Sequence, residues 1–477
     1  MTPRCLAIGL LLASASTTVA AEPPPLPLPP AGNSVPDSRP LPITLPTALR
    51  LADASPLDIA IAAERLQAAS AQYDRARVMW LPNLNLGVNY FRHDGQLQDI
   101  VGIVFPTNKS AFLVGGGPSL YVGVTDAVFA PLAGKQLVKA RQADLQAARN
   151  DTTLAVAEAY FTVQQARGEV AGAVDAARRA DELVARTSKL APALAPTVEI
   201  TRARTELAHR RVAVEAAYER WQLASADLAR ILRLDPTAVV EPAEDPHLRV
   251  TLVDPAFGID DLIPVALTNR PELAAHQAII QATIARVRQE KARPLLPNIA
   301  LRGGAGGTSG LSSGYFGGGL DSDIAKFGGR NTMDLSAVWT FDNLGLGNRA
   351  AVREREAENR VAMLELLRTQ DRVAAEVTQA VARAKRSAIR VKEAEAGVRD
   401  AVDTAERNLT GLGSTKRVGE QLLLVFRPQE AVASVAALEQ AYRDYYAAVA
   451  DSNRAQFRLY RALGHPAQGL NLAPGAP

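Results

Sequence analysis

One pattern occurs twice in the 477-residue chain, and the repetition limits the possible folds more than any other feature. Pro56 corresponds to Pro271, an offset of 215 residues, and Pro82 corresponds to Pro297 at the same offset. Each copy predicts a helix, a strand, a glycine-rich connection, a second strand and two long helices, in that order. A duplicated unit explains the length better than unrelated domains do. We therefore predict a first repeat at residues 47–250 and a second at 251–466.

The predicted helices are longer than an ordinary globular core can hold. The first helix of each repeat is expected at 45–79 and 258–293, where a proline ends it. At about 1.5 Å per residue, residues 133–188 would form a helix of about 84 Å and residues 348–410 one of about 95 Å. The return helices are expected at 196–233 and 428–463.

The second long helix carries a seam of small apolar residues, spaced alternately by three and four. Its members are Ala374, Val377, Val381, Ala384, Ala388, Val391, Val398, Val402, Ala405 and Leu409. Only Glu395 interrupts the series. This is heptad patterning of the coiled-coil type, in which neighbouring helices approach closely. The basic residues beside the seam are expected to face solvent: Arg383, Lys385, Arg386, Arg390 and Lys392.

Alternating segments follow the first helix of each repeat and predict four strands per chain. One face of the first strand is apolar, with Leu84, Leu86, Val88 and Tyr90, and the other carries Asn83, Asn85, Gly87 and Asn89. The return strand carries Leu120, Val122 and Val124. The second repeat shows the pattern at Ile299 and Leu301, then at Leu335, Ala337, Trp339 and Phe341. Glycine-rich connections are expected at 92–117 and 303–330. Such strands suit a soluble sandwich or a barrel that faces lipid.

The N-terminal residues predict export. Arg4, a short apolar run and small residues up to Ala21 are typical of a signal peptide at residues 1–21. The only cysteine, Cys5, lies inside this leader and precedes the apolar run, so neither a disulfide nor a lipid-anchored cysteine is expected. Residues 22–46 form a proline-rich, extended segment, and residues 467–477 form a C-terminal tail.

Four strands cannot close a barrel, and open strand edges do not persist in lipid. Other copies of the chain must therefore pair with these edges. Three copies of the four strands would give a 12-stranded barrel, continued by a long α-helical barrel. The residues alone also leave a dimer open. The expected fold class is mainly α with a small transmembrane β part.

At this point several motifs together resemble the TolC-like outer membrane efflux proteins over nearly the whole mature length. The motifs are Leu81-Pro82-Asn83 and Leu296-Pro297-Asn298 at helix–strand corners, Trp339-Thr340-Phe341-Asp342-Asn343 at a strand–helix corner, Thr197-Val198-Glu199-Ile200-Thr201 after a turn, and Arg461-Ala462-Leu463-Gly464 near the end. The resemblance implies a homotrimeric channel-tunnel in the outer membrane. It also implies a periplasmic adaptor protein and an inner-membrane pump of RND or ABC type as partners. One departure is a second periplasmic turn that is about five residues longer than the family pattern.

The resemblance places a closable end at the two turns farthest from the strands, 189–197 and 411–427. Family members carry acidic residues just inside this end, where Glu199 and Glu430 stand in this chain. In a symmetric assembly, each would form a ring of like charges that favours cations. The alternative is that both are ordinary solvated helix charges.

The turn residues themselves are candidates for contact with the adaptor. They are Leu194, Leu412, Gly411 and Gly413. The alternative for the two leucines is a hydrophobic helix cap.

The sequence gives little support for an enzyme. The histidines His93, His209, His247, His276 and His465 are scattered without metal-ligand spacing, so no cofactor or metal is expected. Lys+Arg total 53 against 50 for Asp+Glu, which gives no basic surface for nucleic acid. The favoured function is an efflux exit duct for small toxic compounds, drugs or metal ions. The alternatives are an exit duct for type I protein secretion and a periplasmic coiled-coil protein without a pore.

Overall fold

The structure is a computed structural model that describes residues 26–29, 39–54, 56–190, 196–254, 256–303, 312–316, 327–331, 333–418, 421–424 and 427–465. Contacts divide the chain into two units. The smaller unit includes Glu169–Glu215 and Lys392–Tyr445, and the larger consists of Asn33–Gly168, Ala216–Val391 and Tyr446–Pro477. Each unit is described by itself below.

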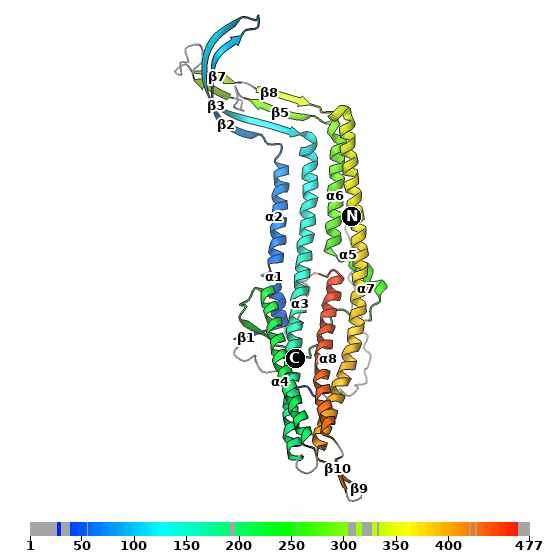
Figure 1. Ribbon diagram of the computed structural model, residues 1–477. Coiled ribbons are helices and arrows are strands. Elements are labelled where there is room, and N and C mark those ends of the chain that lie inside the picture. The colour runs from blue at the N-terminus through cyan, green and yellow to red at the C-terminus, as the bar shows by residue number, and fades with distance from the viewer. Residues whose placement is uncertain are drawn as a thin grey trace. The chain divides into compact units, whose positions relative to one another are not determined.

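In the larger unit, helices from the two repeats lie side by side. Helix α2 (Leu57–Arg77) runs beside the first part of α3 (Val124–Leu190), and α6 (Pro271–Ala292) runs beside the first part of α7 (Leu346–Gly411) (Figure 1). Lys291 Nζ and Glu356 Oε1 are 2.7 Å apart and connect α6 to α7. Alanines of α3 and α6 form a further contact, and their small side chains allow close helix packing.

The first helix of each repeat is divided in two, which corrects the expectation of continuous helices at 45–79 and 258–293. Helix α1 (Leu45–Ala54) precedes α2, and α5 (Ile259–Asn269) precedes α6. Pro56 stands at the N-cap of α2 and Pro271 at the first position of α6. A proline donates no backbone N–H and disfavours a helical conformation in the residue before it, so each one starts a new helix.

Three of the four long helices agree with the predicted ranges to within two residues. Helix α7 is one of them; the other two are α4 (Thr197–Leu232) and α8 (Pro428–Ala462). Helix α3 instead begins at Val124, nine residues before the predicted start at 133, and contains Pro131. The predicted return strand at Leu120–Val124 therefore ends at Gly123. A proline near the start of a long helix removes only one hydrogen bond and does not prevent the helix.

A six-stranded sheet belongs to the larger unit. Its strands are β2 (Asn83–Gln98), β3 (Val104–Gly123), β5 (Asn298–Gly303), β6 (Ser312–Phe316), β7 (Phe327–Asn331) and β8 (Met333–Val338). The order is β7-β6-β3-β5-β8, and β2 also pairs with β3. Strands β2, β3, β5 and β8 are the four that the alternation predicts, but β8 ends at Val338, before the predicted Trp339 and Phe341. Strands β6 and β7 were not expected.

The longest hairpin corrects the prediction of a glycine-rich connection at 92–117. Strands β2 and β3 pair from Asn83↔Ser119 to Gln98↔Val104, so most of that range is strand. The pairing continues past the apolar alternation because antiparallel backbone groups satisfy one another whatever the side chains are.

The coiled-coil seam of α7 is confirmed with two changes. Its valines, Ala384, Ala405 and Leu409 are buried, whereas Val373 is buried beside the half-buried Ala374, and Ser387 is buried where Ala388 was expected. The basic residues beside the seam are exposed, as predicted.

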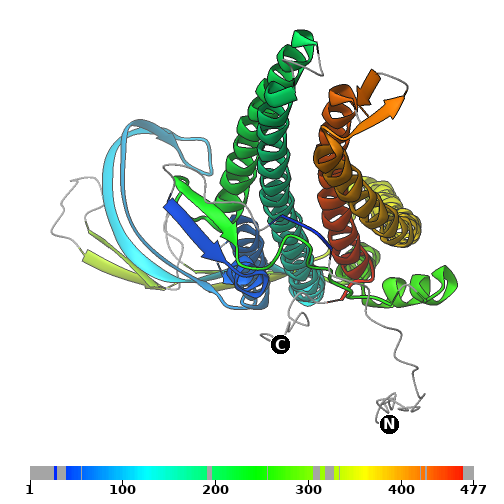
Figure 2. The same cartoon turned by 90° about the horizontal axis from the view of Figure 1, so that it is seen from below.

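The remaining strands form two short pairs. In the larger unit, β1 (Arg39–Ile43) pairs in parallel with β4 (Ala238–Pro242) (Figure 2). In the smaller unit, β9 (Thr415–Val418) and β10 (Gln421–Leu424) form an antiparallel hairpin within the extended second turn. Two 3-10 turns, η1 (Arg293–Leu295) and η2 (Asp342–Gly345), adjoin the sheet. None of the helices described by the structure is long and apolar enough to cross a membrane.

Candidate functional site

The first turn of the smaller unit holds Glu199 in an enclosed position. Helix α3 ends at Leu190 and α4 begins at Thr197; Leu194 lies outside the described residues. Glu199 is only 8% exposed, and its Oε1 accepts a hydrogen bond of 2.6 Å from Nη1 of Arg202. Its Oε2 is buried and has no hydrogen-bond partner among the described residues. An unpartnered buried carboxylate oxygen is unfavourable, so Glu199 is not an ordinary solvated helix charge.

Glu430 differs from Glu199, although both lie in the first turn of a helix. Its backbone N–H donates to the carbonyl of Arg427 at 3.0 Å, and its side chain is exposed. A carboxylate at a helix N-terminus is stabilised by the helix dipole at both positions. The structure thus gives the two candidate ring residues unequal surroundings.

The second turn begins where α7 ends at Gly411. Leu412 is 9% exposed and belongs to a cluster with Leu183, Ala203, Leu409 and Ala431. Gly413 has φ +99°, and a Cβ there would lie 3.4 Å from Cδ2 of Leu190. The burial of Leu412 favours the hydrophobic cap over an exposed docking tip, and Gly413 supplies the left-handed residue that commonly ends a helix.

Above these turns, hydrogen bonds join α3 to α8 within the smaller unit. The Tyr442 hydroxyl donates to Oδ2 of Asp175 at 3.1 Å, and Asp175 also pairs with Arg178 and Arg179 at 2.6 and 2.8 Å. Burial raises the pKa of Asp175, but the hydrogen bonds from Arg179 and Arg178 outweigh it, so the pKa lies below its usual value. Burial is the main cause that raises the pKa of Tyr442. The phenol therefore stays neutral and the carboxylate charged at neutral pH.

Two arginines make further connections in the smaller unit. Arg186 of α3 donates from Nη1 to the carbonyl of Leu409 on α7 at 2.7 Å. Arg210 of α4 forms an ion pair with Glu439 of α8, whose side chain is buried. Sequence patterns do not mark these residues or the Tyr442–Asp175 bond, because charged residues within a long helix are usually solvated. The one signal in the sequence is Gly172, a glycine inside the long helix α3. A Cβ at this position would lie 2.7 Å from Cβ of Tyr442, so the glycine marks the close approach of α8.

The predicted corners lie in the larger unit. Pro82 stands between α2 and β2, and Pro297 stands between η1 and β5. The carbonyl of Pro297 accepts a hydrogen bond of 3.3 Å from the backbone N–H of Val124, where α3 begins. This bond connects the corner of the second repeat to the first repeat.

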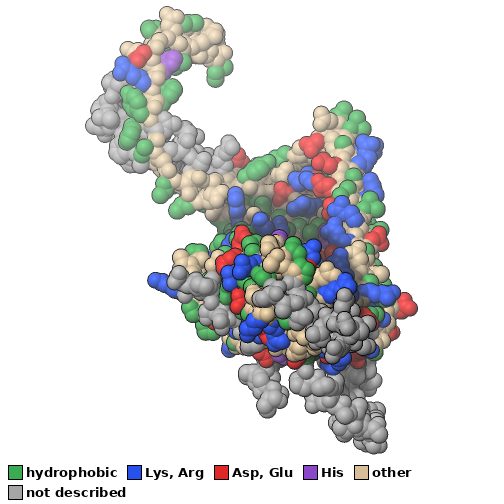
Figure 3. All heavy atoms as spheres, turned by 60° about the horizontal axis from the view of Figure 1, so that its bottom comes forward, with side chains coloured by type: hydrophobic (Ala, Val, Ile, Leu, Met, Phe, Trp, Pro, Cys, Tyr) green, Lys and Arg blue, Asp and Glu red, His purple; other side chains and the backbone are tan. Residues whose placement is uncertain are grey.

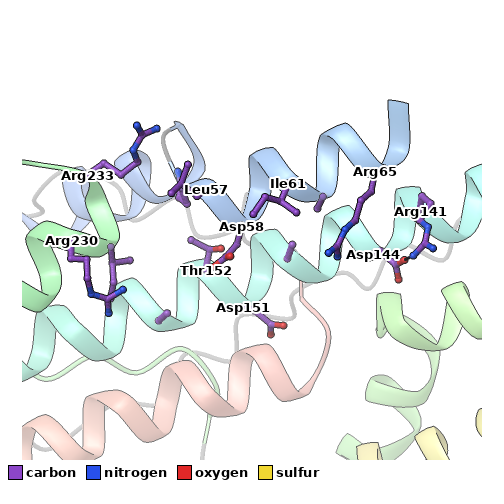
Figure 4. Close-up of a pocket in the computed structure, with 15 residues that line it drawn as sticks. Leu57, Asp58, Ile61, Arg65, Arg141, Asp144, Asp151, Thr152, Arg230 and Arg233 are labelled. Carbon is purple, nitrogen blue, oxygen red and sulfur yellow. Dashed lines mark hydrogen bonds and ion pairs between the residues drawn. The ribbon is translucent and has the colours of Figure 1, made fainter. Parts of the chain in front are cut away.

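A groove of about 820 Å³ runs between α2, α3 and the end of α4 in the larger unit (Figure 4). In the close-up, Arg65 extends from α2 toward α3. Arg141 pairs with Asp144 at 2.9 Å at the same end of the groove. Apolar side chains of Leu57 and Ile61 complete one wall. The groove contains none of the predicted site residues.

The charged side chains do not gather by sign on the face that Figure 3 shows, where Lys and Arg alternate with Asp and Glu over the helices. Among the described residues, no group of three or more His, Cys, Asp or Glu side chains is placed to hold a metal ion. The arrangement offers packed helices, two helix turns and a long hairpin.

Solved structures share this architecture, although no family model and no curated protein sequence matches the chain. The outer-membrane channel OprN has a TM-score of 0.67 and 17% identity over 89% of this chain and 90% of its own. The MtrE outer membrane channel of Neisseria gonorrhoeae has a TM-score of 0.69 and 17% identity over 88% of each chain. The CmeC outer membrane channel of Campylobacter jejuni has a TM-score of 0.69 and 15% identity over 88% of this chain and 85% of its own.

The chain has the outer-membrane channel fold. Each of these matches extends over 85% or more of both chains. The expectation of a mainly helical chain with a small strand part and a channel-tunnel fold is thereby confirmed for the single chain. Within the channel fold, Glu199, Leu412 and Glu430 lie at the helix turns of the smaller unit, and Pro82 and Pro297 lie at the ends of strands in the larger unit.

Proposed function

We propose that three copies of this chain form an outer-membrane exit duct of a tripartite efflux system. The duct would conduct small toxic compounds, drugs or metal ions passively, without catalysis. Its partners would be a periplasmic adaptor and an inner-membrane pump of RND or ABC type. The observation that carries the proposal is the fold match to OprN, MtrE and CmeC, which are outer-membrane channels, over 88–89% of this chain.

The exposed side chains of the hairpin support contact with lipid. Leu84, Leu86, Val88 and Tyr90 project from one face of β2 and are 59–79% exposed in the single chain. The opposite face carries Asn83, Asn85 and Gly87. An apolar face toward lipid and a polar face toward water is the pattern of strands that cross an outer membrane.

The free edges of the sheet support assembly. In the described sheet, β2 pairs only with β3, and β8 pairs only with β5. Unpaired backbone groups are costly in lipid, so each edge needs a strand from another copy. The proposed trimer supplies those strands.

The gate of the proposed duct would lie at the turns of the smaller unit. Three copies of Glu199 and of Glu430 would form two rings of negative charge, which attract cations into a narrow passage. The adaptor would contact the turns that include Leu194, Gly411 and Gly413. The Leu412 side chain would hold these turns in place without contacting the adaptor, because it is packed in the core.

The test is reconstitution of the full-length protein, purified from outer membranes, into planar bilayers. We expect a heat-modifiable trimer on gels and discrete conductance steps. A soluble periplasmic protein that produces no steps would overturn the proposal and favour the coiled-coil alternative. If the protein produces conductance steps and the cells need it to export a secreted protein, the function would be protein secretion and not efflux of small molecules.

A further inference from the structure

In the larger unit, α3 and α8 each have a covered side and an open side. The covered side faces residues 243–253, which are called the strap below. Gln164 of α3 donates from Nε2 to the carbonyl of Asp245 at 2.6 Å. Asn453 of α8 donates from Nδ2 to the carbonyl of Leu248 at 2.7 Å. The strap therefore runs across one side of both helices and leaves the other side open.

The open side carries a stripe of residues spaced by three and four on each helix, and α7 has a stripe with the same spacing. Such spacing places residues on one side of a helix. On α3 and α8 these positions are exposed or half-buried, whereas most neighbouring positions are buried. The stripes contain Asp151, Ala155, Glu158, Thr162 and Gln165 on α3, Asp451, Arg454, Arg458 and Arg461 on α8, and Glu376, Gln379, Arg383, Arg386 and Arg390 on α7. The three stripes together are called the arginine face below.

The arginines of α8 point away from the strap. The backbone N–H of Val253 in the strap donates to Oε1 of Gln456 at 3.0 Å. Arg454 and Arg458 stand two residues before and two residues after Gln456. Because two residues turn a helix by about 200°, both arginine side chains leave α8 on the side opposite to the strap.

Contacts between the stripes engage all four carboxylates of the arginine face. Arg461 Nε lies 2.7 Å from Oδ1 of Asp151 on α3, and Arg461 Nη1 lies 2.9 Å from Oε2 of Glu376 on α7. The other pairs are Arg458 with Glu158, Arg454 with Asp451 and Arg390 with Asp451. The three helices are therefore joined by arginines, and each of these carboxylates is already neutralised.

Two arginines of this face have no such partners. Arg383 and Arg386 are exposed and form no hydrogen bond or ion pair with any other residue that the structure describes. The face has six arginines and four carboxylates, so each chain carries a surplus of two positive charges there. Arg383 also lines a groove of about 360 Å³ between α3, α7 and α8, where Leu154 and Ala380 supply apolar surface. The groove thus presents an unpaired guanidinium beside apolar side chains.

In the proposed duct, the arginine face lines the passage, because a strap on the inner side would obstruct it. We propose that this face binds the carboxylate of organic anions that have an apolar body, and that such compounds belong to the cargo of the duct. A guanidinium presents two parallel N–H donors that match the two oxygens of a carboxylate. The surplus charge of several copies around one passage would add to the attraction of an anion. This inference rests on the proposed function.

The arginine face and the proposed rings of Glu199 and Glu430 have opposite charges. Removal of an arginine from the face should therefore raise the preference of the channel for cations. Removal of the ring carboxylates should lower that preference. The sign of the change thus separates the two sites in one assay.

The test compares Arg383→Gln with the matched control Lys385→Gln in the full-length protein. Lys385 is also exposed, but it stands two residues further along α7 and therefore on the other side of the helix. In planar bilayers, naphthoate should block the current through the wild type and through Lys385→Gln at the same concentration. Arg383→Gln should need about three- to tenfold more naphthoate for the same block, because one charge-assisted contact is lost. Naphthamide, which has the same ring system without the charge, should block all three proteins equally.

Reversal potentials in a salt gradient give a second readout, in which Arg383→Gln should prefer cations more than the wild type does. Arg386→Gln provides another variant of the same face should Arg383→Gln fail to assemble. A wild-type channel that conducts, but that naphthoate blocks no better than naphthamide does, overturns the inference alone. Equal block of the wild type and Arg383→Gln by naphthoate also overturns it. A wild-type protein that does not conduct overturns the proposed function first.

Discussion

The hydroxyl of Tyr442 on α8 donates a hydrogen bond of 3.1 Å to Oδ2 of Asp175 on α3. Gly172 makes this contact possible, because a side chain there would lie within 2.7 Å of Cβ of Tyr442. Arg178 and Arg179 hold the same carboxylate in position. The pair of helices is therefore fixed at one point by a partly buried polar network.

Asp175→Asn should loosen this connection. The amide keeps the shape of the carboxylate but loses the charge-assisted bonds to both arginines, which are stronger than neutral ones. We expect the free energy of unfolding to fall by about 1–3 kcal/mol and the channel to open more often in bilayers. Thermal unfolding and single-channel recording measure the two effects. Asp400→Asn, at an exposed position of α7, is the control and should change neither. If Asp175→Asn has the same stability and the same open time as the wild type, the network has no role in either property.

The pKa of Asp175 also predicts a pH dependence. Its pKa in the folded protein lies below the usual value near 3.8, because the bonds from Arg179 and Arg178 outweigh the effect of burial. A lowered pKa contributes stability that is fully present above the unfolded-state pKa. That stability is lost as the pH falls through the lower folded-state pKa. Acid unfolding of wild type and Asp175→Asn should therefore converge below about pH 4, whereas a constant difference between pH 7 and pH 3 would contradict the assignment.

Glu199→Gln combined with Glu430→Gln should reduce the preference for cations and raise the conductance. Each substitution removes one proposed ring of charge, and fixed charges in a narrow passage dominate ion selectivity. Reversal potentials in a salt gradient provide the measurement. Glu215→Gln, an exposed carboxylate on α4, is the matched control. Unchanged selectivity in the double variant would mean that these carboxylates do not line the passage.

Of the single changes, Glu199→Gln should have the larger effect on stability. Its carboxylate is enclosed and paired with Arg202, whereas Glu430 is exposed. The single variants thus separate a structural effect from an effect on selectivity.

Gly413→Ala should destabilise the second turn. Its φ of +99° is rarely adopted by residues with a side chain, so an alanine there is strained although its Cβ would make only an ordinary contact of 3.4 Å with Leu190. We expect a loss of about 1–2 kcal/mol, visible as a lower Tm. Gly397→Ala is an informative control, because it lies inside α7 with open space around its Cβ. That change should raise stability by about 0.5–1 kcal/mol. Equal shifts in the two variants would contradict the assigned role of Gly413.

The sequence predicted what depends on local pattern. The repeat at Pro56 and Pro271, the seam of α7 and the apolar face at Leu84–Tyr90 each follow from spacing along a single element. What it missed depends on partners far along the chain. The bond between Asp175 and Tyr442 joins residues 267 positions apart, and no periodicity marks it. Strands β2 and β3 likewise extend past their apolar pattern, because hydrogen bonds between the two backbones hold them together whatever side chains they carry.

Arg270→Gln should strongly destabilise the larger unit, because it removes a buried charge. The Arg270 side chain is 2% exposed; Nε donates to the carbonyl of Ala462 at 3.0 Å, and Nη1 lies 2.9 Å from Glu272. It also forms an ion pair with Glu376 of α7. Removing a buried charge leaves its partners unsatisfied, which costs about 3–5 kcal/mol for a fully buried pair. Arg461 also contacts Glu272 and Glu376, at 3.1 and 2.9 Å, so the expected loss is about 2–3 kcal/mol.

The matched control is Arg407→Gln. Arg407 pairs with Asp403 at 2.8 Å, but the two side chains are 75% and 58% exposed, so solvent screens the pair and the change should be within about 0.5 kcal/mol. Urea unfolding followed by circular dichroism measures both variants under the same conditions. The decisive quantity is the difference between them, because it separates burial from charge. Equal midpoints for the two variants would show that the network around Arg270 contributes no more than a surface ion pair does.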